Sequence, residues 1–321
     1  MRARIAARAL LFLSLLPAAP AATLRAQSVT VTGRLVHGGA DSTPLAGRWV
    51  VLHQVTVGSG GPVDSTRTDR SGRYVLRVAG VDTSAVYVVS GWYQGIAYFS
   101  QPVQVVGTTR ASVEPLVVYD TSTTGPPIRV ARRLVTVAQP KRDGTRDILE
   151  ILQLENPGTT TRIASDTARP TWAGAIPREA IQFQAGQGDL SPQAVARRGD
   201  SVAVFGPLAP GVAKQVSYAY VLPASVRRLS IPIDQWTGEV DLLLEDTAAV
   251  VTAKTVEALG VERIEQRTFA RYRMNALEPG DGVTIALPQG PFRVQALLPV
   301  VVGLVALALG VGLVVALRKG P

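Results

Sequence analysis

The sequence predicts an all-β protein, with tandem antiparallel β-sandwich domains followed by a single C-terminal transmembrane α-helix. Two observations predict this fold class. Short segments rich in β-branched and aromatic residues alternate with clusters of Gly, Pro, Asn and Asp from Ser28 to about Phe292. The run from Ala296 to Leu317 then contains no charge and no side-chain hydrogen-bonding group. As a helix it covers about 33 Å, enough to cross a hydrocarbon core of about 30 Å.

The first residues resemble an export signal. Three arginines, Arg2, Arg4 and Arg8, precede a short apolar segment from Ala9 to Leu16. Small residues then fit a cleavage site at Ala19 to Ala21 or at Leu24 to Ala26. We therefore expect a signal peptide over residues 1–26, the alternative being an uncleaved N-terminal anchor. With a transmembrane helix at 294–317 and a tail at 318–321, Arg318 and Lys319 satisfy the positive-inside rule. The region between the two apolar ends is then expected outside the cytoplasm, as the ectodomain of a single-pass protein of the cytoplasmic membrane.

Composition limits the chemistry of this ectodomain. The chain has 321 residues, of which 46% are hydrophobic, and no cysteine, so each exported domain must rely on its own core and not on disulfides. The formal net charge of +9 falls to about +3 once the two predicted termini are set aside. That excess contains no basic run, so nucleic-acid binding has little support.

Residues 27–119 are predicted to form the first β-sandwich. Its expected strands are Ser28 to Val36, Arg48 to Val55, Arg73 to Val78, Ala85 to Val89, Ile96 to Phe99 and Val113 to Tyr119. Turn residues separate them, among them the segments Pro44 to Gly47, Gly58 to Pro62 and Asp69 to Gly72.

Three segments of this region resemble the carboxypeptidase regulatory-like domain: Gly33 to Val36, Pro44 to Leu52 and Thr66 to Tyr74. The resemblance implies a transthyretin-like β-sandwich that serves as an accessory module without catalytic residues. Within the last segment, Gly72 is expected to permit a tight turn at positive φ, and Tyr74 to pack on the core.

A polar, Gly/Pro-rich stretch at 120–127 is predicted to be a linker. Residues 128–293 then form a second β-rich region of one or two sandwiches. Its expected strands are Ile128 to Ala138, Asp147 to Leu154, Ser201 to Phe205, Lys214 to Leu222, Arg227 to Ile233 and Glu239 to Leu244, the last at an edge or half-buried. Ala248 to Leu259 fits a short helix, although its β-branched residues favour a strand. Turns such as Asn156 to Gly158 resemble those of uncharacterised bacterial membrane-anchored extracytoplasmic proteins, a resemblance that concerns architecture.

Few residues suggest catalysis or cofactor binding. The chain has two histidines, His37 and His53, and lacks the H-E-x-x-H and G-x-S-x-G motifs. Its acidic residues lack the spacing of a calcium loop. We therefore expect no enzyme activity, no catalytic residue, no metal site and no cofactor.

Two groups of residues are candidate contact sites. Trp92, Tyr93 and Tyr98 lie in an aromatic segment that fits a glycan or a protein partner, the alternative being that its aromatics fill the core and edge a hairpin. Gly303 and Gly310, with Ala306 between them, place small residues on one face of the predicted transmembrane helix, where a partner helix can pack closely. The alternative is a helix that only anchors.

The expected function is that of a non-catalytic, membrane-anchored binding or scaffold module for protein partners in the cell envelope. Two alternatives remain open: a carbohydrate- or peptide-binding module, and an accessory subunit of a separate envelope enzyme.

Overall fold

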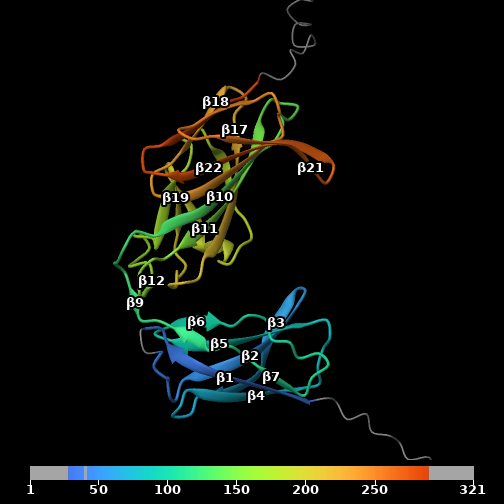
Figure 1. Cartoon of the computed structure of the whole chain (residues 1–321), viewed down its shortest axis with the longest axis vertical. Helices are drawn as coiled ribbons and strands as arrows, with labels where there is room; N and C mark the ends of the chain where they lie inside the picture. Colours follow the sequence, from blue (N-terminus) through green and yellow to red (C-terminus); the bar gives the residue numbers. More distant parts are fainter. Residues whose placement is uncertain (1–27, 40–41, 289–321) are drawn as a thin grey trace, which may run out of the picture. The chain divides into compact units, whose positions relative to one another are not determined.

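The computed structural model describes residues 28–39 and 42–288, and these residues form an all-β fold (Figure 1). The helical segment within them is one 3₁₀ turn, Pro192–Ala194, and no helix among them is long and apolar enough to cross a membrane. The predicted signal peptide, transmembrane helix and tail lie outside the described residues, as do Gly303, Ala306 and Gly310. The chain divides into two compact units.

The first unit contains Ser42–Trp92 and Ala97–Val118 together with the first strand. One of its two sheets has the order β4-β1-β7, with β8 also pairing with β1; the strands are β1 (Ser28–His37), β4 (Arg73–Ala79), β7 (Arg110–Ser112) and β8 (Leu116–Val118). The β1–β4 pair is antiparallel, whereas β7 and β8 run parallel to β1. Alternate side chains of β4 are buried, among them Tyr74, Leu76 and Val78, which gives this sheet one core face.

The other sheet of this unit has the order β3-β2-β5-β6, formed by β2 (Trp49–Thr56), β3 (Ser59–Arg67), β5 (Val86–Tyr93) and β6 (Ile96–Phe99). Its core face points at the first sheet, as Gly91 shows. A Cβ at Gly91 would lie 2.7 Å from Leu35 Cδ1 and 2.9 Å from Leu116 Cδ2. The two sheets therefore pack face to face with their apolar sides together, as in a β-sandwich.

The second unit contains a seven-stranded sheet of order β14-β17-β11-β10-β19-β22-β21. Its pairs are antiparallel except β10–β19, which is parallel. The bounds are β10 (Arg129–Val137), β11 (Arg146–Glu155), β14 (Ile181–Ala185), β17 (Lys214–Leu222), β19 (Thr237–Leu244), β21 (Glu257–Ile264) and β22 (Arg267–Leu277).

Smaller sheets complete this unit. They are β13-β16-β15, β18-β23-β20 and the parallel pair β12-β9. The bounds are β9 (Thr121–Ser122), β12 (Thr161–Arg162), β13 (Trp172–Ala175), β15 (Val195–Arg198), β16 (Ser201–Val204), β18 (Arg228–Pro232), β20 (Val250–Thr252) and β23 (Gly282–Ala286). One apolar cluster runs through the unit from Ile128 to Leu287.

The structure corrects several expectations. The predicted Gly58–Pro62 turn falls mostly within β3, because pairing with β2 compensates for the weak strand propensity of Gly and Pro. Thr121 and Ser122, predicted to be linker, form β9. Strand β19 lies inside the sheet and not at an edge. Within the segment Ala248 to Leu259, Val250–Thr252 form β20 and Glu257 begins β21. The strand alternative is therefore confirmed, and the helix is wrong.

Candidate functional site

The outer face of sheet β3-β2-β5-β6 carries a group of exposed aromatic residues. On β2, the alternation that buries Val50 and Leu52 turns Trp49 and His53 outward. Trp49, Trp92 and Phe99 are 48%, 51% and 60% exposed. We call this surface the aromatic face; its other apolar members are Val51, Val55, Val86 and Val88.

The two tryptophans lie at the same end of the β2–β5 pairing. The register of these strands ends at the pair Val50–Gly91, and Trp49 and Trp92 are the next residues on β2 and β5. Arg67 on β3 pairs with Trp49 on β2. Its guanidinium lies 4.5 Å from the centroid of the Trp49 ring. This contact is a cation–π interaction.

His53 contacts Ser90, which pairs with Val51 and therefore lies on the same side of the sheet as the aromatic face. Its Nε2 lies 2.8 Å from the hydroxyl of Ser90, which is only 1% exposed. Its ring centroid lies 6.0 Å from that of Phe99. Burial lowers the pKa of His53 below its ordinary value of 6.5, because desolvation disfavours the charged ring.

The three aromatics predicted from the sequence have different environments. Trp92 belongs to the aromatic face. Tyr98 is 8% exposed and fills the core, so it cannot take part in a surface contact. Tyr93 is half-buried, and its hydroxyl donates to Asp120 Oδ1 at 3.0 Å. The sequence-based interpretation thus finds one member of the face and misses Trp49, which lies far from Trp92 in the sequence and joins it only through strand pairing.

A groove of about 670 Å³ lies in the same unit between β3 and β4. Val63, Asp64, Val75 and Arg77 are among its lining residues. The carboxylate of Asp64 accepts hydrogen bonds from the backbone N–H of Arg77 at 2.7 Å and of Ser65 at 2.8 Å. Because Asp64 accepts a hydrogen bond from a backbone N–H of β4, we interpret it as a structural residue of the groove.

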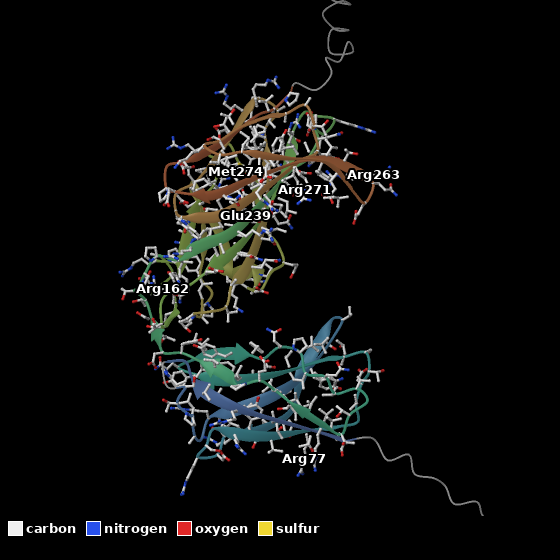
Figure 2. The ribbon with its side chains drawn as sticks, in the orientation of Figure 1. Arg77, Arg162, Glu239, Arg263, Arg271 and Met274 are labelled. Atoms are coloured by element: carbon white, nitrogen blue, oxygen red, sulfur yellow. The ribbon has the colours of Figure 1, made fainter. Side chains whose placement is uncertain are left out.

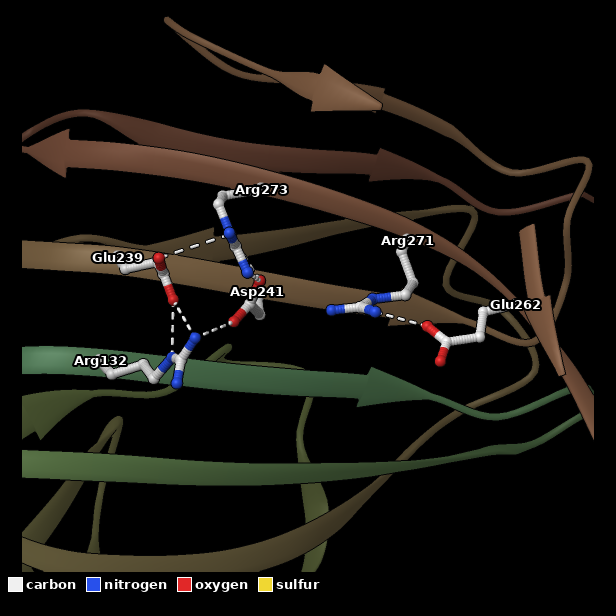
Figure 3. A network of polar contacts seen from close by, with 6 residues as sticks. All are labelled: Arg132, Glu239, Asp241, Glu262, Arg271 and Arg273. Atoms are coloured by element: carbon white, nitrogen blue, oxygen red, sulfur yellow. Dashed lines mark hydrogen bonds and ion pairs between the residues drawn. The ribbon is translucent and has the colours of Figure 1, made fainter. Parts of the chain in front are cut away.

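A group of charged residues on the second unit pairs acids with arginines. On the surface of the seven-stranded sheet, Arg132 and Arg273 alternate with Glu239 and Asp241 across β10, β19 and β22 (Figure 3). Arg271 pairs with Glu262 nearby. Opposite charges balance within this network, so it offers no excess charge to a ligand.

Within residues 28–39 and 42–288, no three His, Asp or Glu side chains gather in a way that would hold a metal ion.

No family model and no curated protein sequence matches the chain. Among solved structures, it is similar to a 9R-lipoxygenase from Cyanothece over 29% of this chain and 17% of that one, at 16% identity and a TM-score of 0.23. An M1 zinc metallopeptidase from Deinococcus radiodurans matches 51% of this chain and 43% of that one, at 10% identity and a TM-score of 0.33. The major pilin subunit of Bacillus cereus matches 81% and 85%, at 12% identity and a TM-score of 0.19.

The chain thus spans less than half the length of the lipoxygenase and of the metallopeptidase. At these TM-scores and identities, the comparisons assign neither a family nor an activity.

Proposed function

We propose that the chain is a non-catalytic, membrane-anchored extracytoplasmic protein that binds protein partners through the aromatic face. The observation that carries the proposal is the exposure of Trp49, Trp92 and Phe99 on one sheet surface, with Arg67 beside Trp49. Protein interfaces are enriched in Trp, Phe and Arg, and Trp and Arg are among the residues that carry most of the binding energy. An exposed apolar patch also costs solubility, so its presence needs a reason such as a partner.

The His53–Ser90 contact has the distance of a nucleophile–base pair, and the environment of Ser90 argues against that role. Its hydroxyl belongs to a residue that is 1% exposed, which leaves a substrate no access to the oxygen. We therefore expect no labelling of the chain by a fluorophosphonate probe. Labelling that is lost in Ser90→Ala would contradict the proposal and indicate a serine hydrolase.

The anchor rests on the two apolar ends of the sequence. With the predicted signal peptide removed and 294–317 in the bilayer, protease added to intact spheroplasts should digest the ectodomain. Digestion only after lysis would contradict this topology.

Photo-crosslinking tests the partner. A benzoylphenylalanine placed at Phe99 in the full chain in cells is expected to form a discrete adduct with an envelope protein. The matched control places the same residue at Val117, which is exposed on the first sheet of the same unit. No adduct is expected there. Trp92→Ala should abolish the Phe99 adduct. No adduct at Phe99, or equal adducts at both positions, would contradict the proposal; an adduct with an enzyme would identify the chain as an accessory subunit.

Carbohydrate binding is the second candidate, because the exposed Trp49 and Trp92 offer ring faces on which a sugar can stack. Binding to a glycan array that is lost in Trp92→Ala, together with no adduct at Phe99, would favour this function.

A further inference from the structure

The seven-stranded sheet of the second unit ends at β21, whose outer edge pairs with no further strand in the described part of the chain (Figure 1). All eight residues of β21 are exposed, so this strand has solvent on both of its faces. Figure 2 shows Arg263 near the free end of the β21–β22 hairpin, with Met274 further back over the body of the unit. Val261 is 65% exposed and Ile264 is 40% exposed. A partly apolar edge of this length is a template for pairing with another strand.

The backbone groups of β21 that face away from β22 follow from the pairing of these two strands. Ile264 pairs with Arg267 across a two-residue turn, and such a turn is closed by a backbone hydrogen bond between its ends. In an antiparallel pair, hydrogen-bonded positions alternate with positions whose N–H and C=O point away. A bulge before Gly260 interrupts this alternation. Val261 and Arg263 are therefore the positions at which a further strand would bond to β21.

These two positions allow three ways for a second β21 to pair antiparallel about a two-fold axis perpendicular to the sheet. Arg263 opposite itself sets two like charges against each other. Val261 opposite Arg263 places Glu262 opposite its own copy, which again opposes like charges. Such pairs are destabilising. With Val261 opposite itself, Glu262 lies opposite Gly260 and the two valines make an apolar contact at the axis. The sequence of β21 therefore favours this third register.

The favoured register also extends a charge contact that each copy makes by itself. Within one copy, Arg271 of β22 forms an ion pair with Glu262 (Figure 3), and Arg271 is the residue that pairs with Gly260. In the dimer, Glu262 of one copy lies in the same row as Arg271 of the other, two strand spacings or about 10 Å away at the backbone. Gly260 between them has no side chain, so the arginine can extend over it. Each Glu262 then contacts an arginine of both copies.

We propose that β21 pairs antiparallel with β21 of a second copy of this chain, with Val261 on the two-fold axis, and so joins two seven-stranded sheets edge to edge. The same edge meets itself, so each contact occurs twice. Backbone hydrogen bonds give such strand addition its affinity, and the contacts between Glu262 and Arg271 fix its register. The pairing lies wholly in the second unit and does not involve the aromatic face, so it can fail while the proposed function holds.

Single cysteines test the register, because the chain has none of its own. The full chain with Val261→Cys is purified in mild detergent and treated with a short bismaleimide. A covalent dimer is expected, since the two thiols lie on neighbouring strands, about 5 Å apart at the backbone. Val250→Cys is the matched control, because Val250 is 62% exposed on β20 of the same unit, and it should stay monomeric. No dimer at Val261, or equal dimers at both positions, would overturn the inference.

Exchanging charges between copies separates the interface from an effect on folding. Glu262→Arg and Arg271→Glu each set like charges across the axis. Each variant alone should therefore dimerise at least about tenfold more weakly than the unchanged chain in sedimentation velocity. An equimolar mixture of the two variants should restore dimers, because the introduced charges then face each other across the two copies. A folding defect in either variant cannot produce this rescue.

The remaining outcomes exclude other modes of association. Dimers that persist in both single variants would show that the copies associate through another surface, such as the predicted transmembrane helix, and would overturn the inference. A mixture that stays monomeric would overturn it as well. In cells, a Val261→Cys crosslink to a different protein, without the homodimer, would show that the edge takes a strand of another partner and would rule out the second copy.

Discussion

Arg133 and Glu150 form an ion pair inside the core of the second unit, with Arg133 Nε 2.7 Å from Glu150 Oε2. Glu150 is completely buried, and Arg133 is 5% exposed. The carboxylate also accepts hydrogen bonds from the hydroxyls of Tyr218 at 3.1 Å and Tyr220 at 2.9 Å. Burial and the adjacent charge of Glu150 raise the pKa of both tyrosines well above 10, so the hydroxyls remain donors.

The first prediction concerns this pair. Glu150→Gln should cost about 3–5 kcal/mol of unfolding free energy, because it leaves the Arg133 charge buried without a counter-ion. Arg133→Met combined with Glu150→Gln should cost less than the sum of the two single changes. Urea unfolding followed by the fluorescence of the second unit measures both. Additive costs would show that the two side chains do not depend on each other.

The second prediction concerns Gly72, which has φ +73°. A Cβ there would lie 2.5 Å from the carbonyl oxygen of Leu35. Gly72→Ala should therefore destabilise the first unit by at least about 1 kcal/mol, through both the backbone conformation and the clash. Gly58→Ala is the matched control, because Gly58 has φ +85° and open space around it. Equal losses in calorimetry would show that the clash with Leu35 relaxes without cost.

The third prediction concerns His53, whose pKa burial lowers below 6.5. The unfolded chain then binds a proton at higher pH than the folded chain does. The contribution of His53 to the stability of the first unit is therefore fully present above about pH 6.5. It is lost as the pH falls through 6.5 toward the pKa of His53 in the folded state. His53→Gln should reduce the pH dependence of the melting temperature of the first unit between about pH 7.5 and 5.5, one unit on each side of 6.5. Carboxylates such as Asp69 contribute equally in both proteins, so identical slopes would contradict a role for His53.

Local sequence signals predicted many of the strands and missed others. Lys214 to Leu222 and Ile96 to Phe99 are β-branched or aromatic segments, and their predicted bounds equal those of β17 and β6. Strand β22 was missed because Arg267–Leu277 shows little alternation in its sequence. It forms between β19 and β21, where partners on both sides supply backbone hydrogen bonds. Such stabilisation depends on tertiary contacts that local propensity does not report.

The candidate face was predictable only in part, for a related reason. The aromatic segment identifies Trp92, and strand alternation explains why Tyr98 turns inward from the same hairpin. Trp49 and His53 join Trp92 only because β2 pairs with β5, a register that nothing in either segment specifies.

The last prediction separates a charge network from an isolated surface pair. Asp241 is 7% exposed and lies between Arg273, whose Nε is at 3.0 Å, and Arg132, whose Nη2 is at 3.1 Å. Asp241→Asn removes the anion between two cations in a partly desolvated position, so it should cost about 2 kcal/mol.

Glu262 is the matched acid on the same sheet, paired with Arg271 and half exposed. Glu262→Gln should change stability by less than about 0.5 kcal/mol, because solvent screens an exposed pair. Urea unfolding at low and high salt distinguishes the two cases. Added salt should leave most of the Asp241 effect in place, since desolvated pairs are poorly screened. Equal costs for the two substitutions would show that the network at Asp241 is no more than a set of surface pairs.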